Sequence, residues 1–234
     1  MKILKTNFLL LAVLIVINGA CVPKETKRDV QSNVFSSSNN PTITIKIDPN
    51  IEYIGVSSTA EEKQSVERTS SQKIKNDMYI FGQVDKDNRV KKMVIIGFRT
   101  LTERGRGTWL PDMHSDMTYK LYSSRSTKIN GKYYQISVKA FTQIDKDLSL
   151  FCQERGITLS NRYLVKITSR IVSNDSTVAM HILYAEDIFF DKDVGKYEIT
   201  EWQSSKTLSD EQKTFLNKFL ERSEDSFQVL NEGT

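Results

Sequence analysis

The side chains best suited to chemistry in this 234-residue chain gather in one stretch, residues 103–117. Asp112, His114 and Asp116 stand at alternate positions and could offer oxygen and nitrogen ligands to one divalent ion. No second cluster of ligands accompanies them in the sequence, and a short flexible segment alone binds a metal weakly. We therefore predict no cofactor and no metal, and keep these three residues as the only metal candidates.

The same stretch also suits recognition of a partner. Arg104, Arg106, Trp109 and His114 place guanidinium, indole and imidazole groups on a glycine-containing loop. This mixture is enriched at the energetic centres of binding interfaces, which often lie on loops. We predict a binding surface for a protein or an anionic polymer. The alternative is a long polar connection with Trp109 packed on the core.

Signatures of catalysis are missing from the sequence. It has no G-x-S-x-G and no H-E-x-x-H, and the glycines of residues 105–107 lack the Lys-Ser/Thr that completes a phosphate-binding loop. His181 lies in a strand-like pattern and Cys152 on an apolar helical stripe, so both are predicted to be packed. The carboxylate pairs at 186–187 and 191–193 are interpreted as solvated. We expect a non-enzymatic protein.

The first residues have the pattern of an export signal. Lys2 and Lys5 precede ten apolar residues, 8–17. As a helix these ten residues reach about 15 Å at 1.5 Å each, half of a ~30 Å hydrocarbon core, so they target the chain without spanning a membrane stably. The signal is predicted to cover residues 1–20.

Gly19 and Ala20 lead directly into Cys21. This segment resembles the lipobox of bacterial prolipoproteins, although Asn18 stands where that family usually carries Leu. The resemblance implies cleavage before Cys21, lipidation of its sulfur, acylation with a palmitate-type chain, and a membrane partner reached through that lipid. Val22 in place of Asp favours the outer membrane, facing the periplasm, in a diderm cell. The alternative is an ordinary signal peptide that leaves Cys21 free.

Composition predicts one domain behind a tether. Residues 21–40 are polar and rich in Ser and Asn, as in a flexible linker, and residues 41–234 are predicted to form a single globular domain. The formal net charge of +4 falls to +2 when Lys2 and Lys5 leave with the signal, so we expect no nucleic-acid partner. A lipidated Cys21 would leave Cys152 as a lone thiol.

Hydrophobic periodicity predicts an α+β fold, with a mostly antiparallel sheet built from hairpins. Alternation in residues 43–47 predicts an early strand, and hairpin turns are expected at residues 85–88, 130–131 and 173–176. Residues 59–75 are predicted to be a short solvated helix or loop. One short helix at 147–155 and a C-terminal amphipathic helix, begun by a Ser209/Gln212 capping box, should pack on the sheet.

Three functions follow from these patterns. The first is a lipid-anchored binding or assembly module of the cell envelope. The second is an envelope hydrolase or metal-dependent enzyme that uses residues 112–116. The third is a surface lipoprotein that contacts a host or a competitor. Basic residues dominate positions 86–106, and acidic residues dominate positions 186–234. The basic stretch could attract anionic lipid or an acidic partner. The ordinary explanation of these charges is a solvated strand face.

Overall fold

The computed structural model describes residues 26–64, 71–103, 119–141, 145–173, 175–202 and 206–233. Cys21 and the stretch that holds Arg104, Arg106, Trp109, Asp112, His114 and Asp116 therefore lie outside the described residues. Within the described ranges, no helix is long and apolar enough to cross a membrane.

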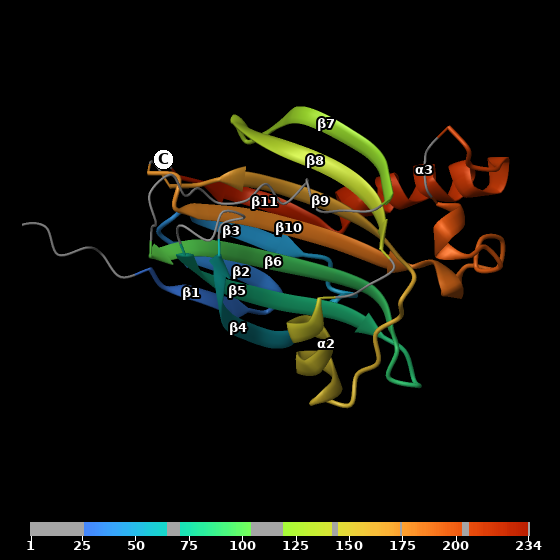
Figure 1. Cartoon of the computed structure of the whole chain (residues 1–234), viewed down its shortest axis with the longest axis horizontal. Helices are drawn as coiled ribbons and strands as arrows, with labels where there is room; N and C mark the ends of the chain where they lie inside the picture. The colour runs from blue at the N-terminus through green and yellow to red at the C-terminus, as the bar shows by residue number, and fades with distance from the viewer. Residues whose placement is uncertain are drawn as a thin grey trace, which may run out of the picture.

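A seven-stranded antiparallel sheet forms the centre of the molecule, in the order β4-β5-β6-β10-β9-β8-β7 (Figure 1). The first three strands in this order are long and follow one another along the chain, whereas β10 is inserted beside β6 from much later in the sequence. The strands are β4 (Glu52–Gln64), β5 (Ser71–Val84), β6 (Val90–Glu103), β7 (Tyr119–Ile129), β8 (Lys132–Phe141), β9 (Tyr163–Ile171) and β10 (Val178–Asp187).

A smaller sheet joins the two ends of the described chain, in the order β1-β2-β3-β11. Its strands are β1 (Arg28–Gln31), β2 (Val34–Ser38), β3 (Thr42–Ile47) and β11 (Phe227–Glu232). The predicted flexible tether over residues 21–40 is therefore wrong for its second part, because residues 28–38 form two paired strands. Phe35, which is fully buried, supplies the apolar contact that holds them.

Two α-helices and two short 3-10 helices complete the described structure: α2 (Lys146–Gln153), α3 (Asp210–Asp225), η1 (Ile188–Phe190) and η2 (Ile199–Glu201). At the start of α3, the Ser209 hydroxyl accepts the Gln212 backbone N–H while the Gln212 side chain accepts the Ser209 backbone N–H. These two bonds satisfy amide groups that a helix end otherwise leaves unpaired. At the start of α2, the Asp145 carboxylate accepts the backbone N–H groups of Asp147 and Leu148.

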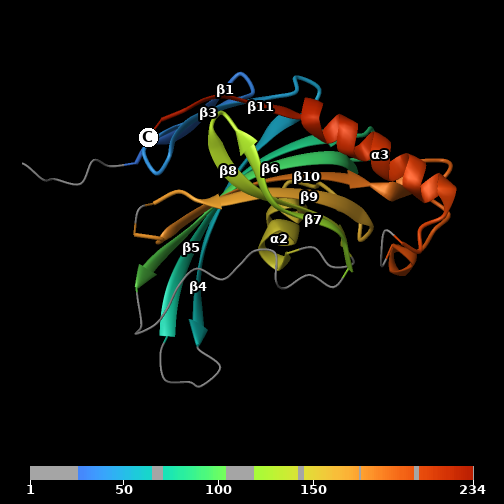
Figure 2. The ribbon, with the colours of Figure 1, turned by 90° about the horizontal axis from the view of Figure 1, so that it is seen from above.

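Other elements pack on both faces of the large sheet (Figure 2). On one face, the small sheet and α3 enclose the main core, which includes Phe35, Phe98 and Phe219. On the other face, α2 covers a second core through Phe151 and Cys152. Because successive strand residues point to opposite faces, Val94 and Ile96 belong to the first core and Ile95 to the second.

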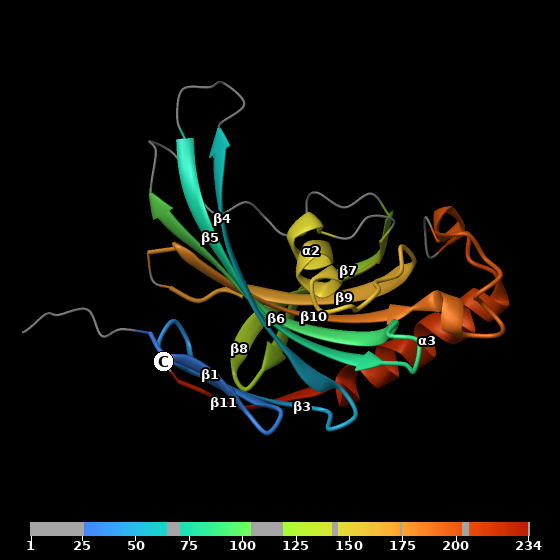
Figure 3. The ribbon, with the colours of Figure 1, turned by 90° about the horizontal axis from the view of Figure 1, so that it is seen from below.

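The expected mostly antiparallel α+β architecture is confirmed. The prediction of a helix or loop at residues 59–75 is wrong for residues 59–64 and 71–75, because β4 continues to Gln64 and β5 begins at Ser71. Residues 65–70 lie outside the described residues. The error has a physical cause: here the two strands extend past the body of the molecule (Figure 3). Polar residues such as Glu62 and Lys73 are exposed there, so the strands lack the apolar alternation that marks a buried face.

Candidate functional site

The two chemically versatile side chains that the structure describes are both enclosed. His181 is 6% exposed and Cys152 is fully buried, so the prediction that both are packed is confirmed. Burial, together with the charge of Arg99, lowers the pKa of His181 to about 3. Burial also raises the pKa of the Cys152 thiol to about 11. At neutral pH both groups are uncharged, and Cys152 is a poor nucleophile in this state.

Among the residues with described positions, no group of three or more His, Cys, Asp and Glu side chains could hold a metal ion. The metal candidates Asp112, His114 and Asp116 are outside that set, as are the binding candidates Arg104, Arg106 and Trp109. The structure therefore does not test those predictions.

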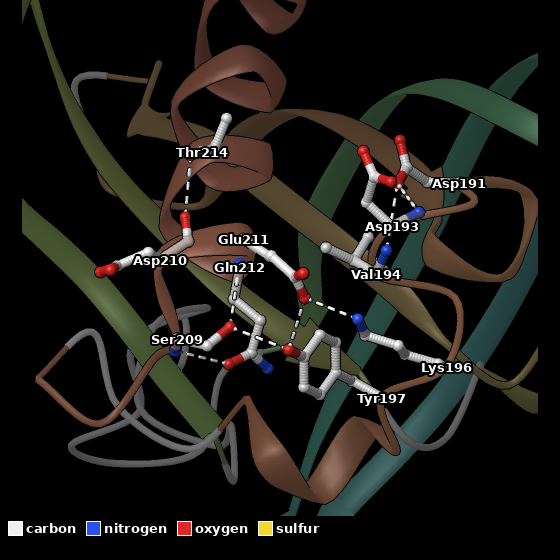
Figure 4. Close-up of polar contacts among 10 residues, drawn as sticks. All are labelled: Asp191, Asp193, Val194, Lys196, Tyr197, Ser209, Asp210, Glu211, Gln212 and Thr214. Carbon is white, nitrogen blue, oxygen red and sulfur yellow. Dashed lines mark hydrogen bonds and ion pairs between the residues drawn. The ribbon is translucent and has the colours of Figure 1, made fainter.

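An acidic recess of about 260 Å³ lies where the turn after η1 meets the N-terminus of α3 (Figure 4). Its walls come from two segments that are far apart in the sequence, and four of its seven residues are carboxylates. The lining residues are Asp191, Asp193, Asp210, Glu211, Thr214, Phe215 and Lys218.

The first wall is a tight turn built around Asp191. Its carboxylate accepts the backbone N–H groups of Asp193, at 2.9 Å, and Val194, at 3.1 Å. The backbone closes the turn when Gly195 N–H donates to the Asp191 carbonyl at 2.8 Å. A Cβ at Gly195 would lie 2.6 Å from that carbonyl oxygen, so only glycine fits without a shift. These contacts hold the Asp193 carboxylate at the rim.

The second wall is the first turn of α3, where Glu211 bonds to the opposite segment. Lys196 Nζ lies 2.7 Å from one Glu211 oxygen, and the Tyr197 hydroxyl donates to the same oxygen at 2.7 Å. The Ser209 hydroxyl in turn donates to the Tyr197 oxygen at 3.1 Å. The hydrogen bond from Lys196 is the main cause that lowers the pKa of Glu211. Residues 196–197 are thereby fixed to the helix.

The carboxylates of the recess differ in what they already bind. The Asp191 carboxylate accepts backbone N–H groups, and the Glu211 carboxylate bonds to Lys196 and Tyr197. Asp210 is exposed, and its one contact of this kind in the described part of the chain is a long one, 3.5 Å to Lys213 Nζ. Asp193 and Asp210 therefore supply the negative charge directed at solvent, beside the apolar ring of Phe215. The lining residues include neither His nor Cys. Carboxylates beside an apolar ring can bind a cationic, partly apolar group.

Comparisons with protein-family models, with curated proteins and with solved structures find no match to this chain.

Sequence reasoning missed the recess and misjudged one of the two carboxylate pairs. Glu186 and Asp187 are 5% and 7% exposed, so they are not solvated as predicted. Asp191 and Asp193 are on the surface, but they form one wall of a concave site. The D-x-D-V-G pattern of residues 191–195 is a local signal for a turn. Nothing local shows that this turn meets α3, because that contact depends on tertiary packing.

Proposed function

We propose that this protein is a lipid-anchored module of the bacterial cell envelope that binds a partner and performs no catalysis. The N-terminal pattern around Cys21 supports the anchor, and the acidic recess supports the binding role. In a diderm cell the proposed location is the periplasmic face of the outer membrane. A protein with this role needs its anchor and its binding surface apart from one another.

The positions of β1 and of the N-terminus of α3 in the molecule carry the proposal. β1, the first element after the anchoring segment, lies at one end of the molecule, and the N-terminus of α3 lies at the opposite end (Figures 1 and 3). An anchor joined to β1 leaves the recess farthest from the bilayer. The partner group that fits Asp193 and Asp210 is a Lys or Arg side chain presented by another envelope protein.

Metabolic labelling with radioactive palmitate tests the anchor. The full-length protein should incorporate the label and sediment with membranes, whereas the Cys21→Ala variant should lose the label and become soluble. A Cys152→Ala variant is the matched control, because its thiol is buried and should not accept lipid. If Cys21→Ala remained in the membrane fraction with its signal removed, the lipid anchor would be refuted.

Photo-crosslinking in cells tests the recess. A photoreactive amino acid at Thr214, which lines the recess, should form a discrete adduct with one envelope protein. The same amino acid at Lys46, exposed on β3, is the control and should form none. Neutralising the rim with Asp193→Asn and Asp210→Asn should reduce the Thr214 adduct at least tenfold. An adduct that persists at full yield in that variant would argue against recognition of a cationic group.

A further inference from the structure

The strand β4 is an open edge of the large sheet. It is 13 residues long and pairs with β5 on one side only. Within the described chain, residues 52–60 form no backbone hydrogen bond outside the β4–β5 ladder. An edge strand of this length leaves a row of N–H and C=O groups that another strand can complete.

The centre of β4 lacks the charged residues and prolines that normally prevent an edge strand from pairing. Residues 54–60, with the sequence IGVSSTA, contain no charge and no proline. The protective features lie toward the ends: a register shift between Tyr53 and Gly55 on one side, and Glu61 and Glu62 on the other. Val56 is 45% exposed, which is unusual for an apolar residue on a strand that has no partner to cover it.

We propose that β4 pairs antiparallel with β4 of a second copy of this chain, around a twofold axis that passes midway between the two Ser58 residues. In this register Val56 lies opposite Ala60 of the other copy, and Ser57 lies opposite Thr59. The two large sheets then continue into one. The inference follows from the sheet edge and does not depend on the proposed function.

The charge pattern of β4 favours a second copy in this register. Glu61 of each copy lies opposite Gly55 of the other, so no two like charges face each other in the pair. Small polar residues, Ser57, Ser58 and Thr59, occupy the middle positions, so no bulky side chains meet across the axis. Directly opposite like charges would destabilise such a pair.

Cysteine crosslinking in the full-length, membrane-bound protein tests both the pairing and its register. Opposite residues in an antiparallel pair have Cα atoms about 4.5–5.5 Å apart, which a disulfide can bridge. Ser58→Cys should therefore form an intermolecular disulfide in more than half of the molecules on mild oxidation. Glu62→Cys is the matched control, because its two copies would lie about 27 Å apart along the strands. The unsubstituted protein should form none, because Cys152 is buried and the sulfur of Cys21 carries the proposed lipid.

A pair of charge variants keeps the test independent of cysteine chemistry. Val56 and Ala60 are both exposed, so lysine at either position leaves the fold intact. Val56→Lys with Ala60→Lys places lysines opposite each other and should lower the Ser58→Cys crosslink at least fivefold. Val56→Lys with Ala60→Glu places opposite charges together and should restore it.

Three results would overturn the proposal. One is equal crosslinking by Ser58→Cys and Glu62→Cys, and another is no difference between the two charge variants. The third is a Ser58→Cys adduct whose mass shows a different protein, which would assign the β4 edge to a foreign strand.

Discussion

At the scale of single residues, Gly97 and His181 depend on each other. They are directly opposite on β6 and β10, and a Cβ at Gly97 would lie 1.8 Å from the His181 Nε2 atom. The imidazole therefore occupies the space that any other residue at position 97 would need. Its Nδ1 atom is buried with no hydrogen-bond partner in the structure.

Gly97→Ala should lower the free energy of unfolding by about 2 kcal/mol, within the range for overpacked cores. In a strand without this clash the same change is stabilising by about 0.5–1 kcal/mol. Urea denaturation of Gly97→Ala, His181→Ala and the double variant measures the coupling. The double variant should be at least 1 kcal/mol more stable than the sum of the single effects. Additive effects would show that the two side chains do not compete for space.

His181 should also make the protein sensitive to acid. Its pKa is about 3 in the folded protein, below its value near 6.5 in the unfolded chain. As the pH falls below about 6.5, the unfolded chain binds a proton that the folded protein excludes, so stability decreases by up to about 1.4 kcal/mol per pH unit. Above that pH the effect is absent.

The measurement is urea denaturation of the wild type and His181→Gln at pH 7.5, 6, 5 and 4. Carboxylates titrate in both proteins, and their contribution cancels in the difference. The stability of the wild type relative to His181→Gln should decrease steadily below pH 6.5. A difference that stays constant with pH would mean that His181 is solvated enough to protonate in the folded state.

At the scale of elements, a partly buried ion pair fixes α3 to the large sheet. Arg222 of α3 donates from Nε and Nη2 to the two oxygens of Glu186 on β10, at 2.7 and 2.5 Å. The Tyr184 hydroxyl donates to Glu186 as well. Nearby, Lys166 of β9 bonds to Ser223 and Glu224 of the same helix. Polar contacts thus add to the apolar packing of Phe215, Leu216 and Phe219 in fixing the position of the helix.

Arg222→Met should destabilise the protein by about 2 kcal/mol, because it leaves the Glu186 carboxylate buried without its cation. Fully buried pairs lose about 3–5 kcal/mol in this way, and the value is lower here because the Arg222 side chain is 34% exposed. Adding Glu186→Gln removes the buried charge and should recover at least half of the loss. Thermal and urea unfolding monitor both variants. No recovery would indicate that Arg222 acts through packing alone.

The small sheet gives a second test at this scale, since β1 and β2 replace a predicted tether. Phe35 of β2 is fully buried and contacts Tyr79 and Phe98. Phe35→Ala should lower the free energy of unfolding by about 3–5 kcal/mol. Ser36→Ala, at the exposed neighbouring position, should change it by less than about 0.5 kcal/mol. A tether would show no difference between these two variants.

Some of these elements can be predicted from the sequence, and others cannot. Local signals suffice where one segment determines its own structure, as in the alternation of Ile43, Ile45 and Ile47 or the Ser209/Gln212 cap. They fail for β2, where Val34 and Phe35 precede three serines and the strand is stabilised by pairing with β3. They also fail for the strand order and the recess, because the β6–β10 pairing and the meeting of residues 191–195 with α3 are tertiary contacts.

At the scale of the whole molecule, the early start of β1 shortens the connection to the proposed anchor. Residues 22–27 alone separate Cys21 from Arg28. Six extended residues span at most about 20 Å, which is less than the length of a typical domain. A lipid on Cys21 would therefore hold the β1 end of the protein close to the bilayer. The acidic recess would face away from it, as the proposed binding role requires.

Energy transfer to an acceptor dye in the lipid headgroups tests this orientation in reconstituted vesicles. Donors at Asp29 of β1 and at Lys213 of α3 occupy exposed positions near opposite ends of the molecule. Transfer from Asp29 should exceed transfer from Lys213 severalfold. Inserting twelve Gly and Ser residues after Val22 lengthens the connection, so it should reduce the difference without changing palmitate labelling. Equal transfer from the two sites in the original protein would mean that the domain lies flat on the membrane, with the recess no farther from the bilayer than β1.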